Sequence, residues 1–294
     1  MRSLRNGELA IDLLEPSSDH ELLGPRFCWG GFIWQVYDAT TGPVLTGPEW
    51  PSPTPDPFNG QGLPESFRHR TREGRPLTWN GTRGVAIGIG TLSLSNDGSV
   101  HVDQPCTWEI TAFRDRAVFH THQAAFGFNY ELVRMVELTG RDLLSVTKLT
   151  NRGTAPLVLE WFVHPFFALA DGMIAATLPA GTELAENPGF ALEKGVLRNR
   201  RRFAGRDDGH FDRVTLPGRQ PLQTRLSHPR LTHIEFSTSF IPTECVIWAN
   251  GHTFSIEPYL AIDLAPGETR QWSLSYRFGG PTHVAVEPGP PADW

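Results

Sequence analysis

The sequence has few cysteines and no long apolar segment. Its cysteines, Cys28, Cys106 and Cys245, lie far apart, and none belongs to a Cys-X-X-Cys motif. An odd number of isolated cysteines is typical of reduced thiols in a cytosolic protein rather than of a disulfide framework. No stretch approaches the roughly 18 apolar residues of a membrane helix, and no apolar secretory region follows the N-terminus. These absences predict a cytoplasmic protein that does not associate with membranes.

Motifs for phosphate cradling and for a serine nucleophile are also missing. Residues 85–90 contain Gly88 and Gly90 but no Gly-Lys-Ser/Thr, and a Gly-X-Ser-X-Gly elbow does not occur. The net charge of -6 argues against a nucleic-acid-binding protein, because such proteins neutralise phosphates with basic side chains. We therefore expect neither nucleic acid nor a cofactor among the ligands.

A metal site is not predicted either, although one pair of histidines is a candidate. His120 and His122 alternate on a predicted strand and share one of its faces. Zinc sites need at least a third protein ligand of suitable geometry, and the sequence does not identify one. A pair of histidines at the surface or rim is the alternative interpretation.

The sequence does contain many strand-like segments separated by turns. Gly (29 residues) and Pro (25) are frequent, and hydrophobic residues make up 39% of the chain, which suits many turns around an adequate core. Without a sustained helical period, regular strands with turn signals predict an all-β fold, a β-sandwich or a related architecture. The expected strands are 32–37, 85–94, 100–102, 108–113, 117–122, 128–138, 143–149, 157–163, 231–236, 245–248, 254–260 and 272–278.

One strand alternates clearly. Within 128–138, one face carries Tyr130, Leu132, Arg134, Val136 and Leu138, the two-residue period of a strand with two distinct faces.

Other segments are expected to be irregular. Residues 46–64 are dense in Pro and Gly, and residues 171–230 are polar and rich in Gly and Arg, which favours solvated loops. We expect an irregular N-terminal segment over 1–24 and a loosely held tail over 279–294. No break in composition separates the strands, so residues 1–294 are predicted to form a single domain.

Two ionisable residues are associated with apolar predicted strands, one just after a strand and one within a strand, and each precedes a proline. His164 ends the segment Leu157–Val163 after an Asn-Arg-Gly turn, and Glu257 lies in Phe254–Leu260. Imidazole titrates near neutral pH, and a carboxylate beside it would complete an acid–base pair. The structural alternatives are a satisfied core or rim histidine and a solvent-facing glutamate.

With these residues in view, the chain resembles the galactose mutarotase-like superfamily, which includes the aldose 1-epimerases. The resemblance implies the large twisted antiparallel β-sandwich of that superfamily, and it spans about residues 24–278. Aldose 1-epimerases also carry an early Asn-Arg pair and an Asp before the Glu strand, for which this sequence has no clear counterpart, so the identity of the substrate does not transfer. The matching segments are 150–153 with 161–167, 254–259 with 264–268, and 24–29, 62–67 and 85–90.

The resemblance implies an acid–base mechanism at a sugar anomeric centre. Glu257 would be the ionised base and His164 the protonated acid, with the carboxylate raising the pKa of the imidazole. The two groups are expected to flank a space about one sugar ring wide. Arg26 and Glu65 are expected to line the same cleft and orient the substrate, with a salt bridge between loops as the alternative.

Aromatic residues near the pair are the candidates for stacking on a sugar ring. They are Trp161, Phe166 and Trp248, and core packing is the alternative for each. We therefore predict an aldose 1-epimerase-like isomerase that binds a small-molecule carbohydrate as a monomer or homodimer. A sugar epimerase or lyase on the same fold, or a non-catalytic carbohydrate-binding protein, is the alternative function.

Overall fold

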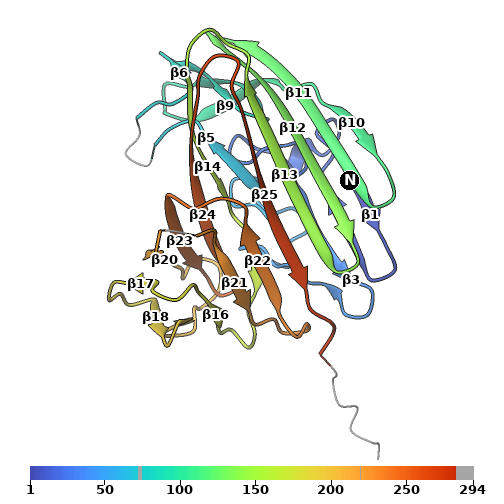
Figure 1. The fold of residues 1–294 in the computed structure, drawn as a ribbon, viewed down its shortest axis with the longest axis vertical. Helices are drawn as coiled ribbons and strands as arrows, with labels where there is room; N and C mark the ends of the chain where they lie inside the picture. Colours follow the sequence, from blue (N-terminus) through green and yellow to red (C-terminus); the bar gives the residue numbers. More distant parts are fainter. Residues whose placement is uncertain (72–74, 219, 283–294) are drawn as a thin grey trace, which may run out of the picture.

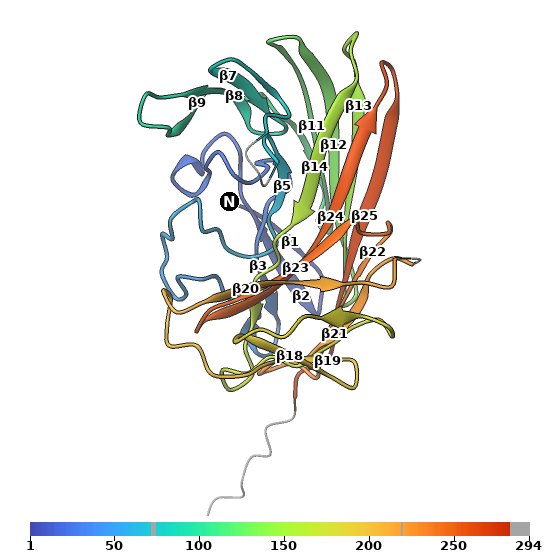
Figure 2. The same ribbon diagram turned by 90° about the vertical axis from the view of Figure 1, so that its left-hand side faces the viewer.

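The structure is a computed structural model that describes residues 1–71, 75–218 and 220–282, and it is built from antiparallel β-sheets (Figures 1 and 2). Within these ranges the helical structure is one 3₁₀ turn, η1 (His20–Leu22). None of the described segments is a helix long and apolar enough to cross a membrane.

Two large sheets carry most of the chain. The ten-stranded sheet contains, in spatial order, β10 (Glu109–Ala112), β11 (Arg116–Ala125), β12 (Phe128–Thr139), β13 (Asp142–Asn151), β25 (Thr269–Phe278), β22 (Ile234–Thr238), β21 (Gln223–Leu226), β16 (Ala176–Thr177), β19 (Val196–Asn199) and β18 (Phe190–Glu193). The seven-stranded sheet contains β17 (Glu183–Leu184), β20 (His210–Thr215), β23 (Glu244–Ala249), β24 (Thr253–Leu264), β14 (Leu157–Val163) and β5 (Glu65–Arg68), with β15 (Phe167–Ala168) paired to β24.

Two smaller sheets complete the structure. One contains β1 (Arg2–Arg5), β2 (Leu9–Leu13), β3 (Ile33–Asp38) and β4 (Gly42–Pro43). The other contains β6 (Trp79–Asn80), β7 (Arg83–Ala86), β8 (Gly90–Leu94) and β9 (Val100–Pro105).

The two large sheets pack face to face. The long strands β11, β12, β13 and β25 run side by side along the longest axis of the molecule (Figure 1). Trp272 of this sheet contacts two side chains of the facing sheet, with its ring centroid 5.4 Å from that of Trp161 and 6.1 Å from that of Phe67. One large hydrophobic cluster includes residues from both sheets. The predicted fold class, a large twisted antiparallel β-sandwich, is confirmed.

Strand register decides which side chains of the seven-stranded sheet enter this core. Opposite residues on neighbouring strands share a face, and successive residues alternate between faces. The register pairs Phe67 with Trp161, and Trp161 with Leu260, so these three enter the sandwich. The other face, on which the candidate site lies, carries Ser66, Arg68, Phe162, Trp248, Ser255, Glu257 and Tyr259.

Most predicted strands are confirmed, including the short segments 32–37 and 245–248, which form most of β3 and β23. Three other regions differ from the prediction. Residues 85–94, predicted as one strand, form the hairpin of β7 and β8 around Gly88, whose φ is 72°. Residues 171–230, predicted to be loop, carry six short strands, β16 to β21. Residues 1–24, predicted to be irregular, contain β1 and β2. Residues 283–294 of the expected tail lie outside the described residues.

A buried histidine makes the stability of this fold depend on pH. His228 accepts hydrogen bonds from the backbone N–H groups of Arg230 and Leu231 at Nδ1, and its Nε2 donates to the carbonyl of Val44. Burial lowers the pKa of His228 from 6.5 to about 4. Because an unfolded histidine takes up its proton first, the free energy of unfolding must fall as the pH drops below 6.5.

We expect this one group to cost up to ~3 kcal/mol between pH 6.5 and 4. The His228→Gln variant should be less stable at pH 7.5 but should lose less stability on acidification, measured by urea unfolding at a series of pH values. His122→Gln, which changes an exposed histidine on β11, is the control and should follow the wild type. Equal pH dependence in all three proteins would contradict the prediction.

Candidate active site

His164 and Glu257 meet where β14 ends beside its neighbour β24. β14 pairs with β24 so that Trp161 lies opposite Leu260 and Phe162 opposite Tyr259. Continuing this register by two residues places position 164 opposite position 257. Cross-strand neighbours lie within side-chain reach, and Nε2 of His164 is 3.2 Å from Oε1 of Glu257. The sequence predicts a gap as wide as a sugar ring here, and the structure corrects this to a direct contact.

The imidazole is held on several sides. Nδ1 of His164 lies 3.1 Å from Oγ of Ser255, which occupies the same face of β24 as Glu257. In the neutral tautomer that satisfies both contacts, Ser255 donates to Nδ1 and Nε2–H donates to the carboxylate. The ring of Phe166 stacks on the imidazole at 4.4 Å, and Trp248 approaches it edge-on at 5.8 Å. The ring therefore has one orientation, with Nε2 toward Glu257.

The electrostatics of His164 differ from the expectation. Burial lowers the pKa of His164 well below 6.5, and the positive charge of Arg26 lowers it further. The expected rise caused by a neighbouring carboxylate is therefore wrong for this structure, because desolvation of the imidazolium and the charge of Arg26 lower the pKa. His164 is neutral at pH 7, and any reaction that needs the imidazolium must supply a proton to the pair.

The pair lines a cavity of about 460 Å³, within the ~300–1,000 Å³ typical of small-molecule sites. Arg26 lines it too, held by a 2.7 Å hydrogen bond from Nη1 to the carbonyl of Phe58. Its guanidinium lies over the ring of Phe27 at 4.7 Å and over that of Phe58 at 4.8 Å. The other residues that line the cavity are Pro48, Asn59, Phe166, Phe211, Trp248 and Tyr259.

Glu65 does not line this cavity. Its side chain is 1% exposed and forms a buried ion pair with Arg134 of β12. Ser145 donates to Oε1 of Glu65 at 2.8 Å, and Thr147 donates to Oε2 at 3.2 Å. The register that pairs Glu65 with Val163 places its side chain in the sandwich. The predicted substrate contact is wrong, and Glu65 instead joins the two large sheets.

Of the predicted aromatic residues, Phe166 and Trp248 line the cavity and Trp161 does not. Trp161 is fully buried against Trp272 and Phe240, so its predicted sugar contact is wrong. Side chains on β14 alternate between its two faces, so Trp161 points into the sandwich, whereas Phe162 and His164 lie on the face of the candidate site.

Ser255, Tyr259, Asn59 and Phe211 were not identified from the sequence. Ser255 and Tyr259 lie two positions from Glu257 on the same strand, so alternation around Glu257 was an available signal. Phe211 belongs to β20, in a segment predicted to be loop, and it pairs with Trp248. Its 48% exposure leaves an aromatic face at the rim of the cavity.

A second hollow, of about 360 Å³, adjoins the first, because Arg26 and Tyr259 line both. It extends over the outer face of β5 and β14. The other residues that line it are Pro25, Phe58, Ser66, Arg68, His69, Arg70, Val100 and Phe162.

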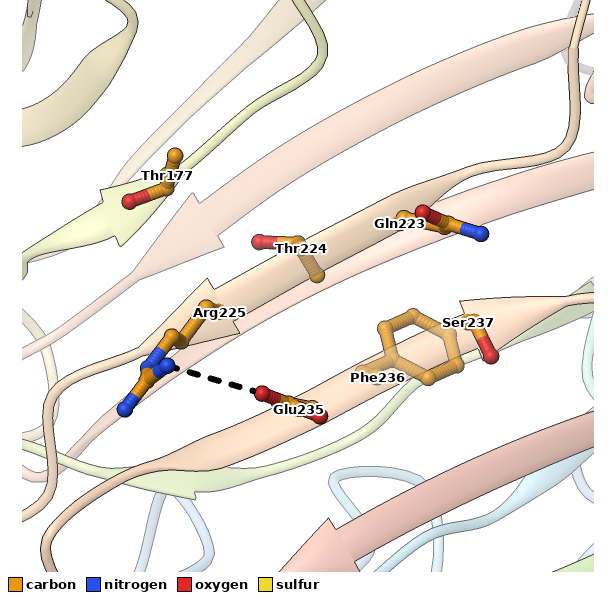
Figure 3. Close-up of a pocket in the computed structure, with 7 residues that line it drawn as sticks. All are labelled: Thr177, Gln223, Thr224, Arg225, Glu235, Phe236 and Ser237. Carbon is orange, nitrogen blue, oxygen red and sulfur yellow. Dashed lines mark ion pairs between the residues drawn. The ribbon is translucent and has the colours of Figure 1, made fainter.

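A separate hollow lies on the ten-stranded sheet over β16, β21 and β22 (Figure 3). Arg225 points toward Glu235 there, with Nη1 and Oε1 3.6 Å apart. These two opposite charges are solvent-exposed, and the other residues that line the hollow are Thr177, Gln223, Thr224, Phe236 and Ser237. This hollow offers no buried acid–base pair among the residues described, so we place the candidate site on the seven-stranded sheet.

The histidines of β11 have separate partners. His120 contacts Glu109 at 3.3 Å and Glu131 at 3.2 Å, whereas His122 contacts Asn129 at 2.8 Å. Within the described part of the chain, no group of three or more His, Cys, Asp or Glu side chains is placed to hold a metal ion.

Comparison with known proteins assigns this chain a fold through similarity to solved structures. No family model matches the sequence, and no curated protein matches it. A galactose mutarotase related enzyme from Lactobacillus acidophilus is similar in structure, with 14% identity, a TM-score of 0.60, and coverage of 96% of this chain and 98% of that one. A proposed aldose 1-epimerase from Escherichia coli K12 is similar with 16% identity, a TM-score of 0.54, and coverage of 95% and 98%.

A galactose mutarotase-like protein from Lactobacillus casei is similar to the same degree, with 16% identity, a TM-score of 0.55, and coverage of 95% and 99%. The chain thus has the galactose mutarotase-like fold over nearly its whole length.

Proposed function

We propose that this protein is an aldose 1-epimerase-like isomerase that interconverts the anomers of a small carbohydrate. The observation that carries the proposal is the 3.2 Å contact between the His164 imidazole and the Glu257 carboxylate in the wall of a sugar-sized cavity. Anomer exchange needs a base and an acid held together and no co-reactant, which is what this pair can supply.

The proposed reaction moves two protons. Glu257 takes the proton of the anomeric hydroxyl while His164 protonates the ring oxygen, so the bond between C1 and the ring oxygen breaks. The C1–C2 bond then rotates, the ring closes on the other face, and both protons return. Because the two groups are in contact, they titrate as one unit, and the competent state holds one proton more than a carboxylate with a neutral imidazole.

The rest of the cavity would hold the sugar. Phe166, Trp248 and the exposed rim residue Phe211 provide faces for the apolar side of a pyranose. Arg26, which also lines the cavity, would donate hydrogen bonds to sugar hydroxyls. The three cysteines are free and buried, which agrees with action in a reducing compartment such as the cytoplasm, as a monomer or homodimer.

Arg26→Gln is expected to raise KM by ~10-fold with kcat largely retained, because a hydrogen bond to sugar would be lost in ground and transition states alike. It should also move the high-pH loss of activity to higher pH. Burial is the largest cause of the low pKa of His164, and the charge of Arg26 is the second. Without that charge the His164–Glu257 pair should retain its extra proton up to a higher pH. Kinetics over pH 5–8 give both results.

Arg26→Lys is the matched control for charge, and it should restore the pH profile but not the KM, since an ammonium lacks the guanidinium fork. Unchanged kinetics with lower thermal stability in Arg26→Gln would assign Arg26 to packing alone.

The proposed function is tested by proton NMR on freshly dissolved α-aldoses of several configurations. Faster appearance of the β-anomer supports the proposal. A new epimer or an unsaturated sugar would instead assign an epimerase or lyase, and saturable binding without turnover would assign a carbohydrate-binding protein. Inertness toward the whole panel would refute the proposal for neutral sugars.

A further inference from the structure

The second hollow, which adjoins the His164–Glu257 cavity, is lined by cationic groups. The charged groups in its lining are the guanidinium groups of Arg26, Arg68 and Arg70, and the imidazole of His69 lies among them. None of its lining residues that the structure describes is acidic. We call this hollow the basic groove. Its shared residues, Arg26 and Tyr259, join it directly to the proposed catalytic cavity.

The arginines of the basic groove are positioned by aromatic rings. Arg70 lies over Trp79 at 4.8 Å, and its Nε is buried without a hydrogen-bond partner. Arg68 uses Nη1 to contact Glu160 at 3.0 Å and lies 5.9 Å from the centre of the Tyr259 ring. Guanidinium groups fixed in this way present planar sets of N–H donors, the geometry that recognises phosphate and carboxylate oxygens.

His69 reports the positive potential of the basic groove. Its pKa is lowered from 6.5 to about 4 by burial and then by the charges of Arg70 and Arg68. Glu160 offsets part of the charge of Arg68, yet its side chain is 35% exposed and outside the lining. Three guanidinium groups in a hollow whose described lining has no carboxylate favour an anion at this place.

We propose that the basic groove binds an anionic group carried by the sugar, so that the substrate of the His164–Glu257 pair is an acidic sugar. The shared chemistry is an oxyanion, either a phosphate ester or a sugar carboxylate. The sugar ring would extend from Arg68 and Arg70, past Tyr259, into the cavity that holds the pair. This inference rests on the proposed function for its substrate, but the groove can be tested without turnover.

The binding test uses inorganic phosphate as the probe, titrated calorimetrically into the wild type at constant ionic strength. Arg70→Gln and Arg68→Gln should each weaken binding by at least ~10-fold, since each removes charge-assisted hydrogen bonds. Arg225→Gln is the matched control on the ten-stranded sheet and should bind like the wild type. Thermal unfolding checks that each variant is folded. Two arginine variants are used so that the test can still be made if one of them fails to fold.

Failure of the wild type to bind phosphate, or equal binding by all four proteins, would overturn the anion site without touching the isomerase proposal. The substrate test then compares anomer exchange of a free hexose, the same hexose as its 6-phosphate, and the corresponding hexuronate.

We expect kcat/KM for one acidic sugar to exceed that for the free hexose by at least ~10-fold, and Arg70→Gln to remove that advantage. Preference for the phosphate or for the uronate identifies the source of the oxyanion. Equal turnover of all three sugars would overturn the groove proposal alone, whereas phosphate binding without turnover of any sugar would overturn the proposed function alone.

Discussion

Glu257→Gln is expected to reduce anomer exchange by at least ~10² while sugar binding and the fold are retained. The amide has nearly the shape of the carboxylate but cannot accept the proton of the anomeric hydroxyl. Glu257 is 4% exposed, on a strand that is buried over residues 253–260, so a change of volume would disturb packing, and the isosteric amide avoids it. The loss should appear in kcat, measured by NMR exchange under saturating sugar.

Glu235→Gln is the matched control, since the same substitution is made on β22 in the hollow of Figure 3. It should leave kcat unchanged. Wild-type activity in Glu257→Gln would show that this carboxylate is not the base.

Glu65→Gln is expected to lower the free energy of unfolding by ~3–5 kcal/mol, because it leaves the charge of Arg134 buried without its counter-ion. Both side chains are at most 1% exposed, and Ser145 and Thr147 would lose an anionic acceptor. Urea unfolding with an unchanged m-value is the measurement. Under conditions in which Glu65→Gln is folded, its KM for sugar should equal that of the wild type, because Glu65 lies outside the cavity.

The double variant Glu65→Leu/Arg134→Met distinguishes the loss of the whole ion pair from the loss of one partner. Apolar residues in place of both charges should be less destabilising than Glu65→Gln alone. Should Glu65→Gln instead raise KM at full stability, Glu65 would be a substrate-binding residue after all.

The long strands could be predicted from the sequence because their side chains alternate over many residues. On β12 this alternation also placed Arg134 among apolar residues on one face, a sign that a buried partner was required. It did not identify Glu65 as that partner, since β5 has only four residues and shows too little periodicity to assign its faces. Trp161 illustrates the same limit, because its face follows from the parity of β14 relative to β24.

The chemistry of the site was predicted in part. The motif positions brought His164 and Glu257 to one place, but their direct contact follows from the β14–β24 register, which is a long-range property. The low pKa of His164 follows from burial and from Arg26, neither of which is local in sequence. Phe211 and the short strands around it had no signal, because two- to six-residue strands in a polar segment do not establish a period.

The acid–base unit of His164 and Glu257 is tested most directly by one measurement. The rate of anomer exchange at equilibrium, by NMR exchange spectroscopy on one accepted sugar, should be compared in the wild type, Glu257→Gln, His164→Asn and the double variant. We expect each single variant to lose at least ~10² in rate and the double variant to lose little more, because two groups that serve one concerted step fail together. Losses that multiply in the double variant, or a single variant as fast as the wild type, would contradict the account.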